Sequence, residues 1–376
     1  MRSVLAAVGA ALAAAAIAAP AAAASPTPTP AAGPAIGGAQ LSGRGVLVNY
    51  PSRAVPRLPK INASAWVIAD AGTGQVLAAK DPHGWYRPAS TLKVLTAISL
   101  IPALNPNAMV VASKQATTVS PNIVGLQRGH SYQVSDLFTA LLTISANDAA
   151  IALAQATGSL SQGMAVINAE ARHLQADDTV AVTPNGLDAP GQHTSAYDLA
   201  LFARQGLRMP AFLKYDQTTS GQFRISKKKS VGLWNQNSLL ATYPGALGGK
   251  IGWTNAAGAT YVGMARRHGV TLIVSLLHCP ALTEIKAGKS LLNWGFAVDG
   301  KARPVGTLVG PKQPPAATPA PSRPTVTAER AKRVERTERA QSVGSGPSAL
   351  VAAGFSCAAL LAAGIGFAYT RRRSRS

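Results

Sequence analysis

The chain has 376 residues and a formal net charge of +21, because 36 Lys and Arg residues stand against 15 Asp and Glu residues. Such an excess first suggests a nucleic acid or another anionic partner. Aromatic residues make up only 5% of the chain, however, which argues against the stacking platforms of nucleic-acid modules. The two cysteines, Cys279 and Cys357, exclude a disulfide framework and a zinc site built mainly from thiolates. We therefore expect no nucleic-acid partner.

The first 45 residues have the composition of an export signal and a spacer. Arg2 gives a positive start, residues 4–19 form an uncharged apolar run, and small residues follow Pro20. This pattern predicts a secretory signal peptide over residues 1–24. The alternative is an uncleaved membrane helix, which the short apolar run disfavours. The Pro- and Ala-rich segment 25–45 cannot bury enough apolar surface to order itself, so we interpret it as a spacer.

The middle of the chain alternates between strand and helix patterns and predicts one α+β domain over residues 46–300. Strands are expected at 65–69, 75–80, 258–265 and 270–278, and helices at 90–101, 194–205 and 281–297, with two helical stretches in 134–156 that are interrupted near Ser145. Strands at both ends of the domain favour one sheet that both ends build, and the long helical middle favours an insertion. We expect an antiparallel sheet flanked by helices, with a helical subdomain.

The end of the chain has the pattern of a membrane anchor. Residues 349–369 carry no charge, and as a helix they would span about 31 Å, close to the thickness of the hydrocarbon core. The basic segment 370–376 follows at once and predicts a cytoplasmic C-terminus. The segment 301–348, rich in Pro and Ala and then charged, is interpreted as a stalk. We therefore expect a single-pass protein whose domain is extracytoplasmic, in a bacterial cell envelope.

Two short motifs in the first half carry candidate chemistry. Ser90 and Lys93 are three residues apart at the start of a predicted helix, so they share one helix face. A serine becomes a useful nucleophile when a base takes its proton, and lysine is such a base when burial or a nearby positive charge lowers its pKa. Ser145 and Asn147 lie between two helical stretches, where a hydroxyl can relay a proton and a carboxamide can bind a peptide bond. Taken singly, each motif also fits a helix cap.

The third motif is the segment 250–254 (KIGWT), which we interpret as an edge strand beside the cleft. Lys250 would supply the positive charge that lowers the pKa of Lys93. Gly252 removes a side chain where a substrate backbone must approach. Thr254 has a hydroxyl that can bind a carboxylate.

Together the three motifs resemble the penicilloyl serine transferases, and within them the D-alanyl-D-alanine carboxypeptidases, also called low-molecular-mass penicillin-binding proteins. The resemblance extends over about residues 55–300 and rests on five segments: 87–93 (RPASTLK), 183–187 (TPNGL), 193–200 (HTSAYDLA), 248–254 (GGKIGWT) and 257–258 (AG).

The resemblance implies a serine peptidase that removes the terminal D-Ala from peptidoglycan stem peptides and binds β-lactams covalently. Ser90 would be the nucleophile, Lys93 the general base and Ser145 a proton relay. The residues implied to bind substrate are Asn147, Lys250, Gly252, Trp253 and Thr254, with the backbone N–H groups of Ser90 and Trp253 as the oxyanion hole. No metal or cofactor is implied.

The sequence departs from the family pattern at Ile251, where the family most often has Thr, so one hydroxyl beside the substrate carboxylate is missing. A class A β-lactamase is a rival interpretation, but no Glu stands in its deacylating context, and Ala146 replaces the usual Asp. An endopeptidase with the same chemistry and a wall-binding protein with a degenerate site also remain open. Cys279 is interpreted as a packing residue. The run 227–229 (KKK) is expected to be a solvated loop, with contact to an anionic wall polymer or lipid headgroups as the functional alternative.

Overall fold

A computed structural model describes residues 35–50, 55–298 and 300–312. The predicted signal peptide (1–24), the predicted membrane helix (349–369) and the basic tail (370–376) lie outside the described residues, as do residues 25–34 of the spacer and 313–348 of the stalk. Within the described part, no single helix has the length and apolar character needed to cross a membrane. One sharply bent pair, Asn147–Gln155 and Leu160–His173, meets the same criteria jointly.

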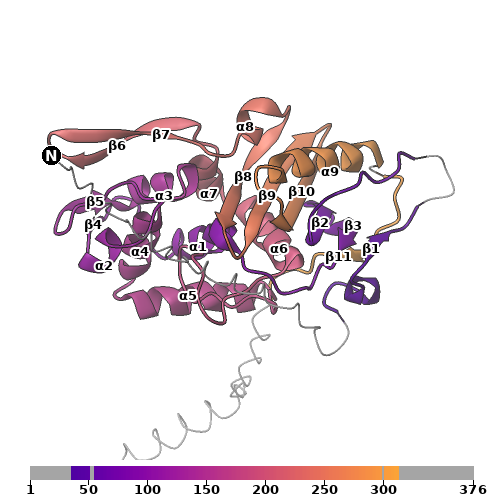
Figure 1. Ribbon diagram of the computed structural model, residues 1–376, viewed down its shortest axis with the longest axis horizontal. Helices are drawn as coiled ribbons and strands as arrows, with labels where there is room; N and C mark the ends of the chain where they lie inside the picture. The colour runs from indigo at the N-terminus through magenta and orange to yellow at the C-terminus, as the bar shows by residue number, and fades with distance from the viewer. Residues whose placement is uncertain (1–34, 51–54, 299, 313–376) are drawn as a thin grey trace, which may run out of the picture. The chain divides into compact units, whose positions relative to one another are not determined.

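An antiparallel sheet of seven strands forms one part of the fold (Figure 1). Its strands are β1 (Val46–Val48), β2 (Ala65–Asp70), β3 (Gln75–Lys80), β8 (Ala246–Thr254), β9 (Gly258–Arg267), β10 (Val270–Cys279) and β11 (Gly306–Thr307). The order is β1-β3-β2-β10-β9-β8, with β11 paired to β3, so β8 is an edge strand. Both ends of the domain therefore build one sheet, as the sequence predicts.

Tight turns connect the two hairpins at the centre of this sheet. In the β2–β3 turn the carboxylate of Asp70 accepts the N–H of Thr73 at 2.8 Å, and Gly74 adopts a φ of 80° that favours glycine. The β9–β10 turn uses His268 and Gly269, both with positive φ. The registers place Ile68 opposite Val274 and Val274 opposite Gly263. Residues 65–69 of β2 are buried in succession, so this strand buries apolar side chains on both faces of the sheet.

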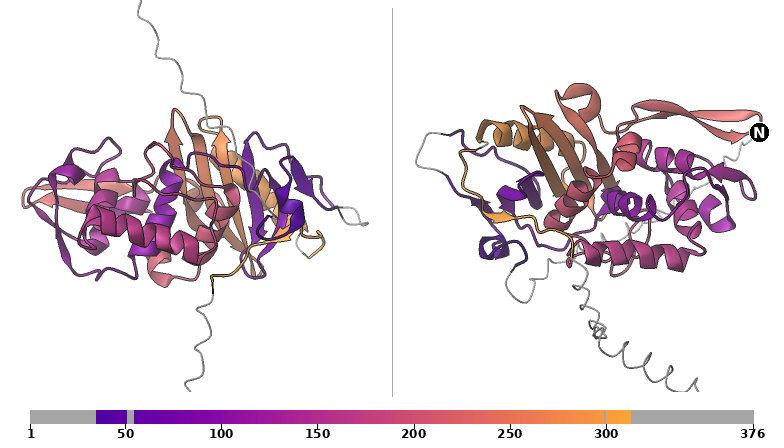
Figure 2. Two further views of the ribbon diagram at one scale, coloured as in Figure 1. Left: turned by 90° about the horizontal axis from the view of Figure 1, so that it is seen from below. Right: turned by 180° about the vertical axis from the view of Figure 1, so that it is seen from behind.

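Helices cover both faces of the sheet (Figure 2). Helix α9 (Glu284–Val298) packs on β9 and β10, and its Leu291, Leu292 and Trp294 join the core on that face. Helix α6 (Ala196–Gly206) packs on β2 and β10 from the opposite face, where Ser195 caps its N-terminus by accepting the N–H of Asp198. Apolar side chains on both faces of the sheet therefore require a helix layer on each side.

Most of the remaining described residues form a helical region beside the sheet (Figure 1). It comprises η2 (Ala89–Leu92), α1 (Lys93–Leu100), α2 (Lys114–Thr117), α3 (Val134–Thr143), α4 (Asn147–Gln155), α5 (Leu160–His173) and α7 (Pro210–Asp216), with the short pair β4 (Met109–Val111) and β5 (Ser131–Gln133). All eight residues of α1 are buried, which places this helix at the centre. The helical insertion and its break near Ser145 are confirmed.

The sequence interpretation did not include the helices α5 and α7 or the short strands β1, β4 and β5, and it missed three further features. Residues 227–229 lie at the tip of a hairpin of β6 (Ser220–Ser226) and β7 (Lys229–Trp234), which leads to α8 (Leu239–Thr242). At the N-terminal side, η1 (Ala39–Ser42) buries Leu41 in the core. At the other end β11 pairs with β3, so ordered structure reaches into the ranges that we interpret as spacer and stalk.

Candidate active site

Ser90 lies at the start of a buried helix beside the edge strand. It belongs to η2, which continues directly into α1, and the residue before it, Ala89, has a φ of 46°. Non-glycine residues seldom adopt positive φ, and such strain is often found at functional sites. The hydroxyl of Thr260 on β9 donates to the carbonyl of Pro88 at 2.9 Å and so ties this turn to the sheet. The turn therefore holds Ser90 at the rim of the cleft.

Lys93 is fully buried one helical turn from Ser90. Its Nζ lies 2.9 Å from Ser90 Oγ, 2.7 Å from Asn147 Oδ1 and 2.6 Å from the carbonyl oxygen of Asn185. Burial lowers the pKa of the Lys93 amine well below its usual value, and the positive charge of Lys250 lowers it further, against the opposing effect of Asp148. The predicted role of Lys250 on this pKa is thus present, but burial is the larger cause.

The segment between α3 and α4 brings Ser145 and Asn147 to the same cleft. Ser145 has a φ of 64°, and its buried hydroxyl has no hydrogen-bond partner among the described residues. Asn147 accepts from Lys93 and donates through Nδ2 to the carbonyl of Ser120 at 2.8 Å. A buried hydroxyl without a partner is costly, so it marks a place where a ligand or substrate group completes the hydrogen bonding.

Asp148 fixes the loop that forms one wall of the cleft. Its buried carboxylate accepts the N–H groups of Val124, Gly125 and Leu126 at 2.8 to 3.0 Å. The backbone N–H of Asn147 donates to the carbonyl of Asn122 at 2.7 Å. These hydrogen bonds link the start of α4 to this loop, a role that the sequence interpretation missed because the carboxylate binds only backbone groups.

The strand β8 places the third motif along the other side of Ser90. Gly252 faces η2: a Cβ on this glycine would lie 2.6 Å from Ser90 N and 2.9 Å from Thr91 N. The missing side chain therefore allows the strand and the nucleophile turn to approach. Trp253 lines the cleft and is 56% exposed. Thr254 lies at the end of β8, and its hydroxyl accepts the N–H of Ala257 at 3.0 Å.

Lys250 is buried behind the cleft surface and does not line it. Its Nζ donates to the carbonyl of Ile251 at 2.8 Å. Burial lowers the pKa of Lys250 to about 7, although the carboxylate of Asp216 opposes this shift. Burial likewise raises the pKa of Asp216 to about 7, against the hydrogen bond from Gly249 and the charge of Lys250. The positive charge at Lys250 is therefore weakly held and can respond to an anionic ligand.

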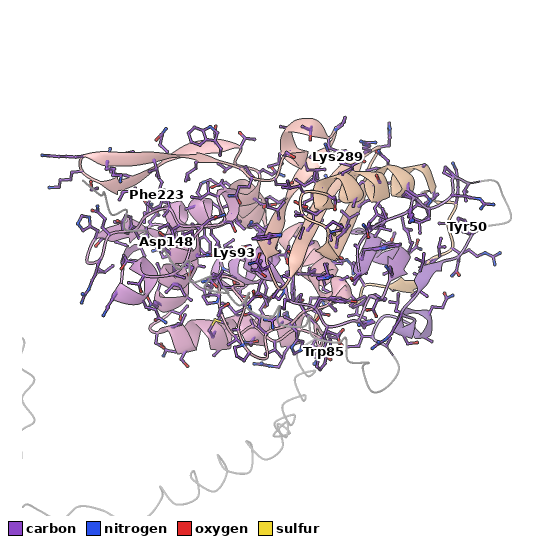
Figure 3. The ribbon with its side chains drawn as sticks, in the orientation of Figure 1. Tyr50, Trp85, Lys93, Asp148, Phe223 and Lys289 are labelled. Atoms are coloured by element: carbon purple, nitrogen blue, oxygen red, sulfur yellow. The ribbon has the colours of Figure 1, made fainter. Side chains whose placement is uncertain are left out.

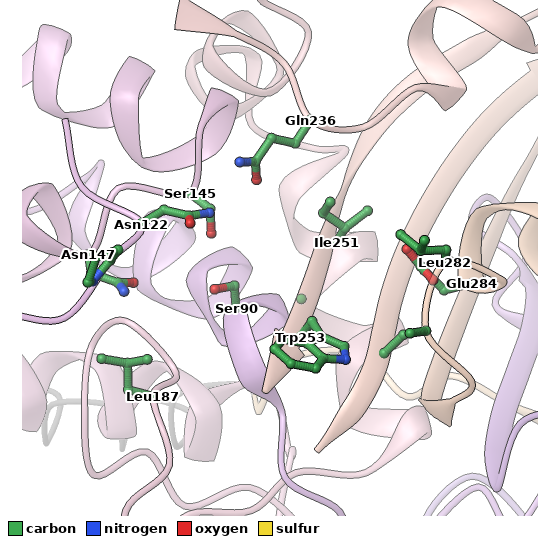
Figure 4. A pocket seen from close by; sticks show the side chains of 14 residues that line it. Ser90, Asn122, Ser145, Asn147, Leu187, Gln236, Ile251, Trp253, Leu282 and Glu284 are labelled. Atoms are coloured by element: carbon green, nitrogen blue, oxygen red, sulfur yellow. The ribbon is translucent and has the colours of Figure 1, made fainter. Parts of the chain in front are cut away.

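These groups surround a cavity of about 550 Å³ (Figure 4). Of the residues predicted from sequence, it is lined by Ser90, Ser145, Asn147, Gly252 and Trp253. Sequence reasoning missed Asn122, Leu187, Gln236, Leu282 and Glu284, which line it as well. Most of these residues lie in loops that are distant in sequence, and only the folded chain brings them next to Ser90. Figure 3 shows Lys93 well inside the fold, between the helical region and the sheet.

Cys279 and the histidines do not contribute to this site. Burial raises the pKa of the Cys279 thiol to about 12, and the charge of Glu284 raises it further, so the thiol is held in its unreactive form. In the part of the chain that the structure describes, no three His, Cys, Asp or Glu side chains are grouped to hold a metal ion.

A serine hydrogen-bonded to a buried lysine, at the edge of an antiparallel sheet, defines a serine hydrolase of the penicillin-binding type. The sequence profile described as D-alanyl-D-alanine carboxypeptidase matches residues 52–280. The chain is 38% identical over 264 residues to the D-alanyl-D-alanine carboxypeptidase DacB2 of Mycobacterium tuberculosis, covering 69% of this chain and 90% of that protein. The chain therefore belongs to the D-alanyl-D-alanine carboxypeptidase family.

Another relative and two solved structures of this kind are also similar to this chain. The curated DacD of Escherichia coli is 31% identical over 256 residues, which is 64% of either chain. A crystal structure of a D-alanyl-D-alanine carboxypeptidase from M. tuberculosis H37Rv superposes with a TM-score of 0.65 at 38% identity, covering 69% of this chain and 99% of that one. Penicillin-binding protein 6B from E. coli gives a TM-score of 0.59 at 30% identity, covering 66% and 81%. The chain thus spans less of DacD than of DacB2.

Proposed function

We propose that this protein is a serine-type D-Ala-D-Ala carboxypeptidase, which removes the terminal D-Ala from peptidoglycan stem peptides through an acyl-enzyme and which β-lactams acylate. The observation that carries this proposal is the buried amine of Lys93, 2.9 Å from the hydroxyl of Ser90. The family to which the chain belongs supports the substrate class.

The hydrogen-bond inventory of Lys93 supports its role as the general base. Two of its partners, Asn147 Oδ1 and the carbonyl of Asn185, can only accept hydrogen bonds. A neutral amine has two N–H groups for these acceptors, and its lone pair then faces the third partner, the Ser90 hydroxyl. The amine can therefore take the Ser90 proton as Oγ attacks the carbonyl of the penultimate D-Ala.

Ser145 is proposed as the proton relay to the leaving group. Its hydroxyl lines the cleft with Ser90 and is free to pass the proton to the amine of the departing D-Ala. Water then hydrolyses the acyl-enzyme. Asn147 holds Lys93 in place and, through its remaining amide hydrogen, can bind the substrate peptide bond.

The close approach at Gly252 supports an oxyanion hole built from backbone groups. A Cβ there would lie 2.6 Å from Ser90 N, so the backbone of β8 runs directly beside that amide. The N–H groups of Ser90 and Trp253 are the proposed donors to the oxyanion, because two preorganised donors stabilise the charge that develops in the transition state. The terminal carboxylate of the substrate is assigned to Thr254 and to the positive charge of Lys250.

The proposed setting is the outer face of a bacterial membrane. It rests on the sequence patterns of the signal peptide (1–24), the spacer (25–45), the stalk (301–348), the membrane helix (349–369) and the cytoplasmic tail (370–376), around a catalytic domain at 46–300. Export and a single C-terminal anchor would bring the site to the cell wall.

Release of D-Ala from a pentapeptide ending in D-Ala-D-Ala tests the proposal. The native protein should release D-Ala, and Ser90→Ala should release none. Hydrolysis of a penicillin without release of D-Ala would favour the β-lactamase alternative, and cleavage of cross-linked dimers alone would favour the endopeptidase. Absence of all three reactions would leave the wall-binding alternative and overturn the proposal.

A further inference from the structure

The cavity continues past Ser90 to the far side of the edge strand. In Figure 4, Ile251 and Trp253 stand on β8 between Ser90 on one side and Leu282 and Glu284 on the other. Successive side chains of a strand point to opposite faces. Gly252 faces η2, so Ile251 and Trp253 face the side of α9, where Ile251 packs against the core. The lining of the cavity therefore includes residues on both faces of β8, and we call the part next to α9 the α9 lobe.

The α9 lobe contains an acidic group without a partner. Glu284, the first residue of α9, is only 7% exposed, and its Oε2 atom is buried without a hydrogen bond. Neither of the ion pairs recorded within the described residues includes Glu284. Lys286 is two positions along α9, and such residues do not face each other on a helix. An unpaired buried carboxylate is costly, so it marks a place for a donor that the protein does not supply.

The walls of this lobe are apolar and leave room above the carboxylate. Trp253 is 56% exposed and Leu282 is 93% exposed, although both side chains are large and apolar. The cross-strand partner of Trp253 on β9 is Ala259, whose small side chain also lines the cavity. The lobe thus places exposed apolar side chains beside a carboxylate, which complements a side chain with an apolar stem and a cationic tip.

An extended substrate would reach both faces of β8. In a peptide that pairs with the free edge of β8, neighbouring residues of the same chirality point to opposite faces of the strand, whereas neighbours of opposite chirality point to the same face, so a peptide that ends in L-Xaa-D-Ala-D-Ala presents side chains to both faces. In a peptide that ends in D-Ala-D-Ala, the two terminal residues have only methyl groups. The residue before them is the nearest one that can carry a long side chain across β8.

We propose that Trp253, Leu282 and Glu284 form a specificity subsite, which binds an amine-bearing side chain of the residue that precedes D-Ala-D-Ala; this inference rests on the proposed function. The Glu284 carboxylate accepts the hydrogen bond of the ammonium group, and the two apolar side chains enclose the stem. The domain is otherwise basic, with 24 Lys and Arg against 12 Asp and Glu in residues 25–310, so this local carboxylate is what permits a cation to bind.

Two peptides that differ by one charge test this subsite in the full-length protein. Nα-acetyl-L-Lys-D-Ala-D-Ala keeps the side-chain amine, whereas Nα,Nε-diacetyl-L-Lys-D-Ala-D-Ala lacks its charge. We expect a kcat/KM about tenfold higher for the free amine, since a charge-assisted hydrogen bond is typically worth that factor or more. In Glu284→Gln this ratio should fall to about one, with the loss mainly in KM. Glu170→Gln, the same change on α5 away from the cavity, should keep the ratio of the native protein.

The outcomes separate the subsite from the function. If Glu284 had only a structural role, Glu284→Gln would lower kcat/KM for both peptides by the same factor and keep their ratio, and this result would overturn the subsite. Equal use of both peptides by the native protein would overturn it too. No D-Ala release from either peptide by the native protein would overturn the proposed function instead. Labelling of Glu284→Gln by a fluorescent penicillin shows that this variant is folded. Glu284→Lys is a second variant, which we expect to prefer the uncharged peptide.

Discussion

The contact between β8 and the turn that carries Ser90 gives the sharpest prediction. In Gly252→Ala, the new Cβ would lie 2.6 Å from Ser90 N and 2.9 Å from Thr91 N. Ordinary van der Waals contact begins near 3.4 Å, so the strand and η2 must separate by about 0.8 Å. Both atoms belong to backbone and cannot rotate away. The substitution therefore moves the nucleophile relative to β8.

A displacement of this size has a large effect on chemistry, because a misplacement of about 1 Å can cost about 100-fold in rate. We expect Gly252→Ala to lower the second-order rate of acylation by a fluorescent penicillin by about 100-fold. Gly221→Ala is the matched control, because nothing lies within 4 Å of the position of its Cβ. Thermal unfolding of both variants shows whether the fold is kept. An acylation rate within about threefold of the native protein would refute the argument that β8 and η2 are held at contact distance.

Two further predictions concern pH and Ile251. Burial lowers the pKa of Lys93, so the neutral base is present at pH values far below the usual lysine range. The kcat for D-Ala release should therefore rise with pH and level off well below that range. Burial lowers the pKa of Lys250 to about 7, so KM should increase above about pH 7 as this residue loses its charge. A kcat that falls as pH rises, or a flat KM, would contradict these assignments. Ile251→Thr restores the hydroxyl that the family most often has and should raise kcat/KM for the peptide, whereas Ile251→Val, which adds no hydroxyl, should not. Unchanged or lower turnover in Ile251→Thr would count against this view of the position.

The parts of the fold that the sequence predicts are those with strong local patterns. The hairpins around residues 72 and 268 are marked by glycine turns between apolar runs, and the break at Ser145 separates two apolar helices. The very short strands β1, β4, β5 and β11 escape prediction because two or three residues carry no periodicity. Helix α5 contains Gly163, which lowers helix propensity, yet a Cβ there would clash with the backbone of Ala154 on α4. Close packing of two helices, which no local pattern shows, explains this glycine.

Only some residues of the candidate site can likewise be predicted from the sequence. Ser90, Lys93, Ser145 and Asn147 are predictable because their motifs, together with the segment 250–254, resemble those of a known family, whereas each motif taken singly also fits a helix cap. Glu284 and Asp148 are not predictable in this way. Glu284 stands in the sequence as an ordinary carboxylate at a helix start, and Asp148 binds backbone groups, most of them in a loop that is distant in sequence. In the structure Lys250 is buried and does not line the cavity, so its charge lowers the pKa of Lys93, and its proposed contribution to binding the substrate carboxylate is electrostatic.

The central claim is that Ser90 is the nucleophile and that Lys93 activates it. Incubation of the purified protein with a fluorescent penicillin, followed by mass spectrometry of the labelled peptide, tests this most directly. We predict one covalent adduct on the peptide that contains Ser90, and no adduct in Ser90→Ala. An unlabelled native protein, or an adduct on any other residue, would contradict the account.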